Sequence, residues 1–345
     1  MYKKIIILVI PLTFLILCIG TSIGSSDTSL IHLASIIGYK VLGIPLLKEI
    51  NPNDVAIIWN LRLPRVFLAF LVGSSLSVSG AVVQSLLRNP LASPYTLGVS
   101  SGASLGVGFL IISGFSIPML GRLTLPLTGF LCGLLTVFII IKFAYNVDKS
   151  MSTSTIILSG MVFSLFCSAI LTTVTALYSE DIKSIALWEM GSFSMKGWSY
   201  VQMGIPFFII GIIGVMRYCT EMDILSFGED QAKSVGVDVN TIKTRLLIFS
   251  AILTGSAVAL SGIIGFVDLI IPHLVRRIIG AKHKYVIPVC IILGGCFMVI
   301  TDLVARIIII PSELPVGAIT ALIGAPFFAY IYLSLIHISE RAGKA

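Results

Sequence analysis

Runs of about 20 apolar residues recur along almost the whole chain, and each carries few or no charged side chains. Such a run is long enough to cross the hydrocarbon core of a membrane as a helix. Only 11% of the 345 residues are Asp, Glu, Lys or Arg, whereas a soluble chain carries about 25%. No polar stretch is long enough to fold separately. The sequence therefore predicts an all-α polytopic membrane protein in which residues 1–345 form a single transmembrane domain.

The apolar runs predict about ten transmembrane helices. With ends defined to about four residues, they cover residues 1–20, 63–87, 94–112, 123–145, 152–178, 200–216, 244–264, 267–280, 285–308 and 314–336. Between the first two runs lies a mixed polar segment, for which we expect an outer loop with a short helix at about residues 30–42.

The first run admits two other interpretations, a cleaved signal peptide and a lipoprotein signal ending at Cys18. Leu17 stands where a lipoprotein signal needs a small residue, and no small-x-small cleavage site follows cleanly. We therefore expect a retained first helix with its amino end in the cytoplasm.

Ten spans with a cytoplasmic amino end predict which connections face the cytoplasm. Of the 23 Lys and Arg residues, 15 fall on that side, as the positive-inside rule requires: Lys3, Lys4, Arg88, Lys142, Lys149, Arg217, Lys233, Lys243, Arg245, Arg276, Arg277, Lys282, Lys284, Arg341 and Lys344. Cytoplasmic anchoring also explains the net charge of +7, so this charge does not point to nucleic acid.

An internal repeat relates the two halves of the chain. Residues of the second predicted span and of the turn and third span after it recur in the seventh and eighth spans at an offset of 182 positions: Leu71, Gly73, Ser74, Ser79, Gly80, Pro90 and Gly98 match Leu253, Gly255, Ser256, Ser261, Gly262, Pro272 and Gly280. Each repeat would hold five helices, and an odd number inverts the second copy in the membrane. Transporters often contain such inverted repeats, with the path at their interface.

The stretch from Arg62 to Ser104 combines small residues at helical spacing with a turn that contains two prolines. Small residues let helices approach closely in a membrane, and the prolines end one helix before the next begins. For this stretch and its repeat we predict roles in helix packing or in the translocation path. The residues concerned are Gly73, Gly80, Gln84, Asn89, Pro90, Gly98, Gly102, Gly262 and Pro272.

The order of motifs in this stretch is RLPR, a small-residue run ending at Gln84, NPLASP and LGVSSGA. It resembles the membrane permease subunits of ABC importers for iron–siderophore complexes, haem and cobalamin. Downstream, GFVDLIIPH, TDLVAR, ELPVG and ALIGAPF at residues 265–273, 301–306, 313–317 and 321–327 also resemble that family. The resemblance extends over nearly the whole chain from Arg62 onward.

The resemblance implies a multi-pass subunit of the bacterial cytoplasmic membrane. It would pair with a second copy or a paralogue, bind separate ATPase subunits and receive its ligand from an extracytoplasmic substrate-binding protein. The ligand would be an iron chelate such as a ferric siderophore, with haem or cobalamin as alternatives. The sequence contains no Gly-rich Lys loop of the Walker type, so we expect a transport subunit without catalytic residues or cofactor.

Residues 221–243 form the longest polar stretch of the second half, EMDILSFGEDQAKSVGVDVNTIK. Glu229 and Asp230 after Gly228 suit the start of a short helix, and Gly236 suits its end. The stretch resembles the family's ATPase-coupling segment, so we expect Gly228, Glu229, Asp230, Lys233 and Gly236 to contact the ATPase. A solvated linker is the alternative.

Three arginines, Arg62, Arg65 and Arg306, fall on the predicted outer side, where anchoring does not require them. In the resembling family, outward arginines at these motif positions receive acidic residues of the binding protein. We therefore expect a docking pocket for that protein. The alternative is that the side chains only reach for the lipid headgroups.

An ion-coupled secondary transporter also uses inverted repeats, but it usually needs ionisable groups near the middle of the membrane. Asp268 is the serious candidate for such an ionisable group, and it lies at a position where the resembling family commonly has a small residue. We expect Asp268 to be structural or to face a cavity.

The six cysteines and four histidines show no metal-ligand spacing, and no catalytic constellation suggests a membrane enzyme. We expect no metal site.

Overall fold

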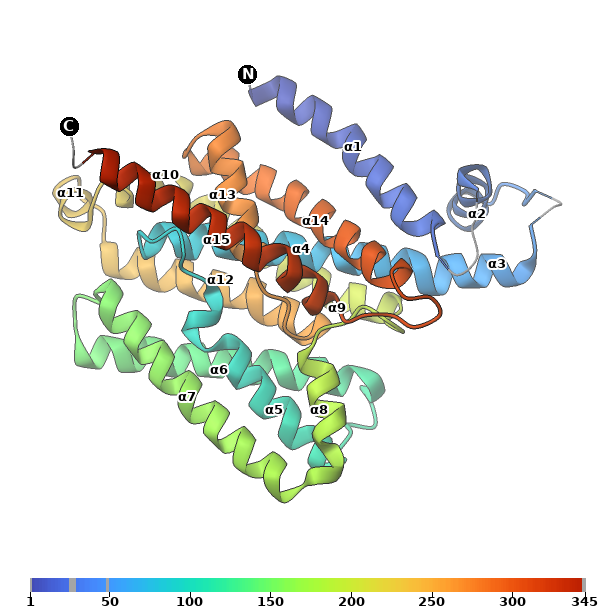
Figure 1. Cartoon of the computed structure of the whole chain (residues 1–345), viewed down its shortest axis with the longest axis horizontal. Coiled ribbons are helices and arrows are strands. Elements are labelled where there is room, and N and C mark those ends of the chain that lie inside the picture. Colours follow the sequence, from blue (N-terminus) through green and yellow to red (C-terminus); the bar gives the residue numbers. More distant parts are fainter. Residues whose placement is uncertain (1, 25–28, 48–49, 343–345) are drawn as a thin grey trace.

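The computed structural model describes residues 2–24, 29–47 and 50–342, with side chains described from residue 9 to residue 330 within those ranges. Its first half contains α1 Tyr2–Ser22, α2 Leu30–Leu42, α3 Pro52–Ile57, η1 Ile58–Arg62, α4 Leu63–Leu86, η2 Pro94–Leu97, α5 Val99–Ser113, η3 Gly121–Leu123, α6 Thr124–Val147 and α7 Thr153–Leu177. The second half contains η4 Ser179–Asp181, α8 Ile182–Glu189, α9 Trp198–Arg217, α10 Cys219–Leu225, α11 Glu229–Ser234, α12 Val239–Ser261, α13 Val267–Ile279, α14 His283–Ile307 and α15 Val316–Ala342. No strand occurs among these residues (Figure 1).

Each of the ten predicted spans corresponds to a helix, so the all-helical polytopic fold is confirmed. Six helices have the length and composition to cross a membrane, and four shorter apolar helices occur in the described part of the chain. The short α2 has the predicted bounds of 30–42. The side chains of Lys3, Lys4, Arg341 and Lys344, which entered the topology prediction, lie outside the described residues.

The structure differs from the sequence prediction in two helix boundaries and one additional helix. The second span begins earlier, because α3, η1 and α4 form one continuous helical segment from Pro52 to Leu86. Between the fifth and sixth spans, where the sequence prediction places no helix, the structure contains the short helix α8. The seventh span begins at Val239, because the Asp238 side chain accepts a hydrogen bond from the Thr241 amide and caps the first turn.

The centre of the molecule is α4, which is buried almost from end to end. It packs against α9, α12, α13 and α14 (Figure 1). Gly73 of α4 meets Gly294 of α14 so closely that a Cβ atom on either would overlap the partner's backbone. Ser79 hydrogen-bonds Ser250 at 2.6 Å and Thr254 at 2.5 Å across the α4–α12 contact. Small and hydroxyl residues therefore set the interhelical distances, as expected where packing rather than water drives association.

The packing of the two halves is reciprocal. Helix α4 of the first half packs on α13 and α14 of the second, and α12 of the second half packs on α5 and α6 of the first. Since α4 and α12 carry the sequence repeat, exchange of neighbours is what an inverted pair of five-helix repeats predicts.

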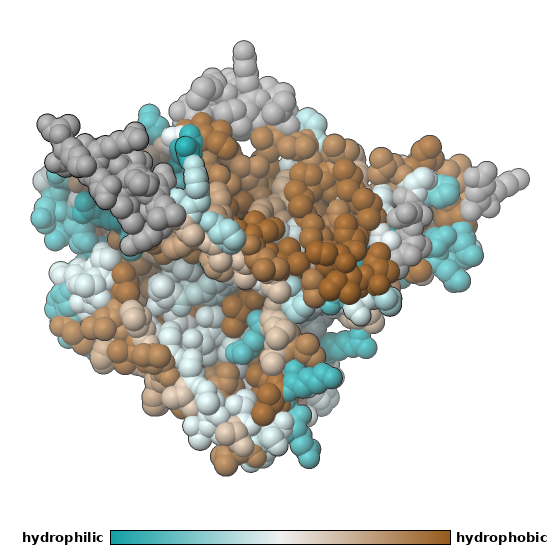
Figure 2. Space-filling view, in the orientation of Figure 1, coloured by the Kyte–Doolittle hydropathy of each residue, from teal (hydrophilic) through white to brown (hydrophobic). Residues whose placement is uncertain are grey.

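The molecular surface agrees with a membrane crossing parallel to α4 and α14. On the face shown in Figure 2, hydrophilic residues lie at the left end, at the right end and along the lower right, and a broad hydrophobic area occupies the upper middle. The left end in Figure 1 carries α10 and α11, and the right end carries α2 and α3. From the basic residues, we assign the left end to the cytoplasm.

Candidate functional site

A cluster of charged side chains lies at the outer end of the helices. Arg62 ends η1 and Arg65 lies in the first turn of α4. Asp302 and Arg306 lie in the last turns of α14, and Glu313 lies in the connection to α15. The three arginines and Glu313 line a cavity of about 230 Å³. Its wall includes Gly24, Ser194 and Met195. We call this cavity and its five charged side chains the outer arginine cluster.

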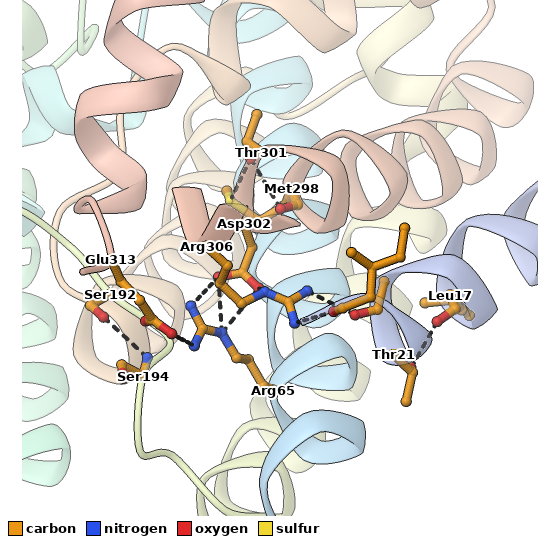
Figure 3. Close-up of polar contacts among 12 residues, drawn as sticks. Leu17, Thr21, Arg65, Ser192, Ser194, Met298, Thr301, Asp302, Arg306 and Glu313 are labelled. Carbon is orange, nitrogen blue, oxygen red and sulfur yellow. Dashed lines mark hydrogen bonds and ion pairs between the residues drawn. The ribbon is translucent and has the colours of Figure 1, made fainter. Parts of the chain in front are cut away.

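Arg65 is held by two carboxylates at once (Figure 3). Its Nε and Nη2 atoms donate to Asp302 at 3.1 and 2.9 Å, and its Nη1 atom donates to both oxygens of Glu313 at 2.9 and 3.0 Å. The two-sided fork of guanidinium is suited to such paired contacts. The guanidinium of Arg65 is therefore fixed between α14 and the α14–α15 connection.

The other two arginines cap the carboxyl end of α1 by donating hydrogen bonds to its last carbonyls. Arg62 Nη1 donates to the Ser22 carbonyl at 3.0 Å, and Arg306 donates to the carbonyls of Gly20 and Ile23 at 2.7 and 3.3 Å. Arg306 Nε also lies 3.2 Å from Asp302. The last carbonyls of a helix lack intrahelical partners and carry partial negative charge, so arginines stabilise this end.

The structure thus brings the three predicted docking arginines together around one cavity, and it buries them. The two roles considered from the sequence, docking and contact with lipid headgroups, did not predict that these arginines bind groups of the same chain. Asp302 and Glu313 were missed as site residues, although both lie in motifs that the sequence made visible. The spacing of Asp302 and Arg306, four residues apart on one helix face, was the available signal. Docking itself stays a prediction.

Lys196 lies beside this cluster, in the connection between α8 and α9. Its Nζ atom donates to the carbonyl of Leu260 at the end of α12. Burial, together with the positive charge of Arg65, lowers the pKa of Lys196 to about 7. Below that pH the side chain adds a positive charge near the arginines.

At the cytoplasmic end, the predicted coupling segment forms two short helices, α10 and α11. Gly228 has φ +132° and Gly236 has φ +86°, conformations that side chains with a Cβ rarely adopt, so both predicted glycine breaks are real. Asp230 is fully exposed and lies 3.8 Å from Lys233. These polar residues are accessible to a partner.

Glu229 has a different environment from its neighbour. Its carboxylate pairs with Lys243 Nζ at 2.6 Å, and Lys243 is buried and donates to the Met151 carbonyl as well. Glu229 therefore ties α11 to α12. Phe227 and Val235, on either side of α11, are 75% and 66% exposed. Sequence reasoning selected the charges of this segment and missed these two apolar side chains, which offer contact area on the same surface.

A polar network connects α10 to the centre of the bundle. Asp223 accepts from His283 at 2.6 Å, and His283 contacts Ser85 of α4 at 2.5 Å. Arg276 of α13 donates to Ser85 at 2.9 Å and to Gln84 at 2.6 Å. Four helices are linked in this way. The network gives Gln84, predicted for packing or path, a definite place between α4 and α13.

The other residues predicted for packing or path mostly occupy close contacts. A Cβ atom on Gly80 would overlap the backbone of Asp268, one on Gly102 would overlap Thr136, and one on Gly262 would overlap the Trp188 carbonyl. Gly98 ends η2 with φ +72°.

Three further members of the predicted set shape the backbone. Asn89 stabilises its turn by accepting from the Leu91 amide at 2.9 Å, Pro90 follows it, and Pro272 lies inside α13. These contacts explain packing and turns. A role in translocation stays a prediction.

Asp268 is fully buried at the first turn of α13, so it does not face a cavity. Ser93 donates to its Oδ2 atom. A carboxylate at the amino end of a helix is favoured by the unpaired amides there. Among the residues described, no group of three His, Cys, Asp or Glu could hold a metal ion.

Comparison with known proteins agrees with this architecture. The sequence profile of the FecCD transport family matches residues 12–334. The chain is 45% identical to the uncharacterized ABC transporter permease YvrB of Bacillus subtilis, over 86% of this chain and 82% of that protein. It is 36% identical to the hemin transport permease HmuU of Yersinia pestis, over 95% of this chain and 96% of that protein.

Two further likenesses are informative. The chain is 36% identical to the cobalamin import permease BtuC of Halobacterium salinarum, over 83% of this chain and 76% of that protein. A solved inward-facing ABC transporter of the metal-chelate type has a TM-score of 0.82 and 30% identity, over 96% of this chain and 99% of that one. With the match along almost its full length, the chain belongs to the FecCD transport family and is the non-catalytic, multi-pass membrane permease subunit of a bacterial ABC importer.

Proposed function

We propose that this permease moves an iron chelate, such as a ferric siderophore, across the cytoplasmic membrane. The observation that supports this most is the full-length likeness to a hemin permease and to a transporter of the metal-chelate type. Haem itself and cobalamin are the alternatives, the second because of the likeness to a cobalamin permease.

Uptake by cells separates these substrates. A strain lacking this gene, and the same strain complemented with it, are given a radiolabelled ferric siderophore, haem or cobalamin. Loss of siderophore uptake in the deletion strain, restored by complementation, is the expected result. Loss of haem or cobalamin uptake alone assigns the substrate to that alternative.

We further propose that the outer arginine cluster receives the extracytoplasmic binding protein, that α10 and α11 receive the ATPase, and that a second copy or paralogue completes the path. ATP binding would displace α11, and the Asp223–His283–Ser85 contacts would pass this displacement to α4. The ATPase and the binding protein would then favour different accesses of the permease by binding them unequally.

The first prediction concerns the ATPase contact. Replacing Phe227 with Ser is expected to weaken ATPase binding about tenfold or more, because exposed aromatic residues often carry much of an interface energy. Since 75% of Phe227 is exposed, the permease should still fold. The measurement is ATPase co-purification with the permease in detergent, together with ATP-dependent uptake.

The matched control is Met119→Ser, a change of a 96% exposed apolar residue on the outer side. Equal ATPase recovery from both variants would contradict the coupling proposal. Charge reversal at Glu229 is a poorer test, because it would place a second cation beside the buried Lys243.

The second prediction concerns docking of the binding protein. Arg62→Gln removes a charge and keeps an N–H donor for the Ser22 carbonyl. Association should slow about threefold to tenfold at low salt, with the difference shrinking as salt rises, because such charges act mainly on the association rate. The measurement is binding kinetics on permease–ATPase complexes in nanodiscs across a salt series.

Lys183→Gln is the control, since Lys183 is an exposed outer-side cation in α8, remote in sequence from the cluster. If the binding protein associates with Arg62→Gln as fast as with Lys183→Gln and the parent permease, the outer arginine cluster is not its docking site.

A further inference from the structure

Two carboxylates hold Arg65, and they differ sharply in accessibility. The Asp302 side chain is 1% exposed, whereas the Glu313 side chain is 39% exposed. Asp302 also pairs with Arg306, and both residues lie within the helix α14. Glu313 belongs to the connection between α14 and α15 and lines the outer cavity together with the three arginines. Of the two partners of Arg65, Glu313 is therefore the one that a partner protein can reach from outside.

We propose that Glu313 is a displaceable latch: its carboxylate occupies Arg65 until an acidic side chain of the binding protein replaces it there. This inference rests on the proposed docking function and assigns Glu313 a role within it. The latch consists of the contacts from Arg65 Nη1 to the two Glu313 oxygens, at 2.9 and 3.0 Å.

An exchange of partners suits the electrostatics of this site. The side chain of Arg65 is only 10% exposed, and Asp302 occupies its Nε and Nη2 atoms. Departure of Glu313 alone would leave the buried Nη1 donor without an acceptor, which is disfavoured. Glu313 accepts from Nη1 while the binding protein is absent. An incoming carboxylate would make equivalent contacts, so the exchange itself gains little free energy. Docking would then be reversible, as a binding protein that must leave after delivery requires.

The charge balance favours an acidic partner once Glu313 moves away. Three guanidinium groups face two carboxylates in the cluster, so the displaced state has a further unit of positive charge around the cavity. The cavity of about 230 Å³ next to Glu313 provides space for an acidic side chain. The segment that must move is the connection outside α14 and α15, and the helices that hold Asp302 and Arg65 stay in place.

Glu313→Gln tests the latch. The amide keeps the shape and one acceptor oxygen but lacks the charge, so the competition with an incoming carboxylate weakens. We expect the binding protein to associate about threefold to tenfold faster at low salt and to dissociate more slowly. The measurement uses permease–ATPase complexes in nanodiscs and the cognate binding protein, with Glu313→Ala as a second variant that should change both rates in the same direction.

Two comparisons make the result decisive. Glu180→Gln removes an exposed outer-side carboxylate of η4 and should change the rates less than twofold, which separates displacement from a general loss of negative charge. Slower or unchanged association of Glu313→Gln overturns the latch. If Arg62→Gln still slows association, the latch alone is wrong, and if Arg62→Gln has no effect either, the docking proposal fails with it.

Discussion

Arg65→Met is expected to destabilise the permease by about 3 to 5 kcal/mol, the cost of removing one partner of a buried ion pair. The variant leaves Asp302, which is 1% exposed, with Arg306 as its remaining charged partner. It also releases the α14–α15 connection, which Arg65 holds through Glu313. The measurement is the midpoint of thermal unfolding in detergent, with the amount of permease in the membrane as a second readout.

The controls distinguish the charge from the geometry. Arg65→Lys retains the positive charge and cannot contact both carboxylates with a fork, so its stability should lie between those of the parent and Arg65→Met. Arg65→Met combined with Asp302→Asn should recover part of the loss, because the buried carboxylate is gone. A double variant as unstable as Arg65→Met would show that the Asp302 charge is not the cause of the loss. An Arg65→Met variant as stable as the parent would contradict the prediction itself.

The second large effect is expected from Gly73→Ala. A Cβ atom at this position would overlap the carbonyl oxygen of Gly294, and this contact joins the backbones of α4 and α14. Because backbone cannot rotate away as a side chain can, the helices must separate, and close-packed interiors tolerate this poorly. We expect a loss of about 3 kcal/mol, at the upper end of usual overpacking costs, seen as a lower unfolding midpoint and less permease in the membrane.

The sequence repeat supplies a matched control for this substitution. Gly255 is the counterpart of Gly73, but a Cβ atom there would meet Phe130 at 3.5 Å, an ordinary contact distance. Gly255→Ala should leave the unfolding midpoint within about 0.5 kcal/mol of the parent. If both alanine variants are equally stable, helix separation at the α4–α14 contact is not costly.

This pair of glycines also shows which information the sequence contains and which only the structure provides. The repeat was visible from matching residue types, and the repeat predicted that α4 and α12 correspond. It could not predict that Gly73 meets backbone whereas Gly255 meets a phenylalanine ring, because each environment is formed by helices that lie far away in the chain.

The sequence by itself determined the membrane class, the approximate positions of ten helices and the family, because long apolar runs and ordered motifs are local properties. It also marked the ends of α11 through Gly228 and Gly236, since a positive φ is a local demand that glycine meets. Only the tertiary structure decided what the arginines contact. Arg65 meets Asp302 and Glu313, 237 and 248 positions away, and such pairings depend on how α1, α4 and α14 end beside one another.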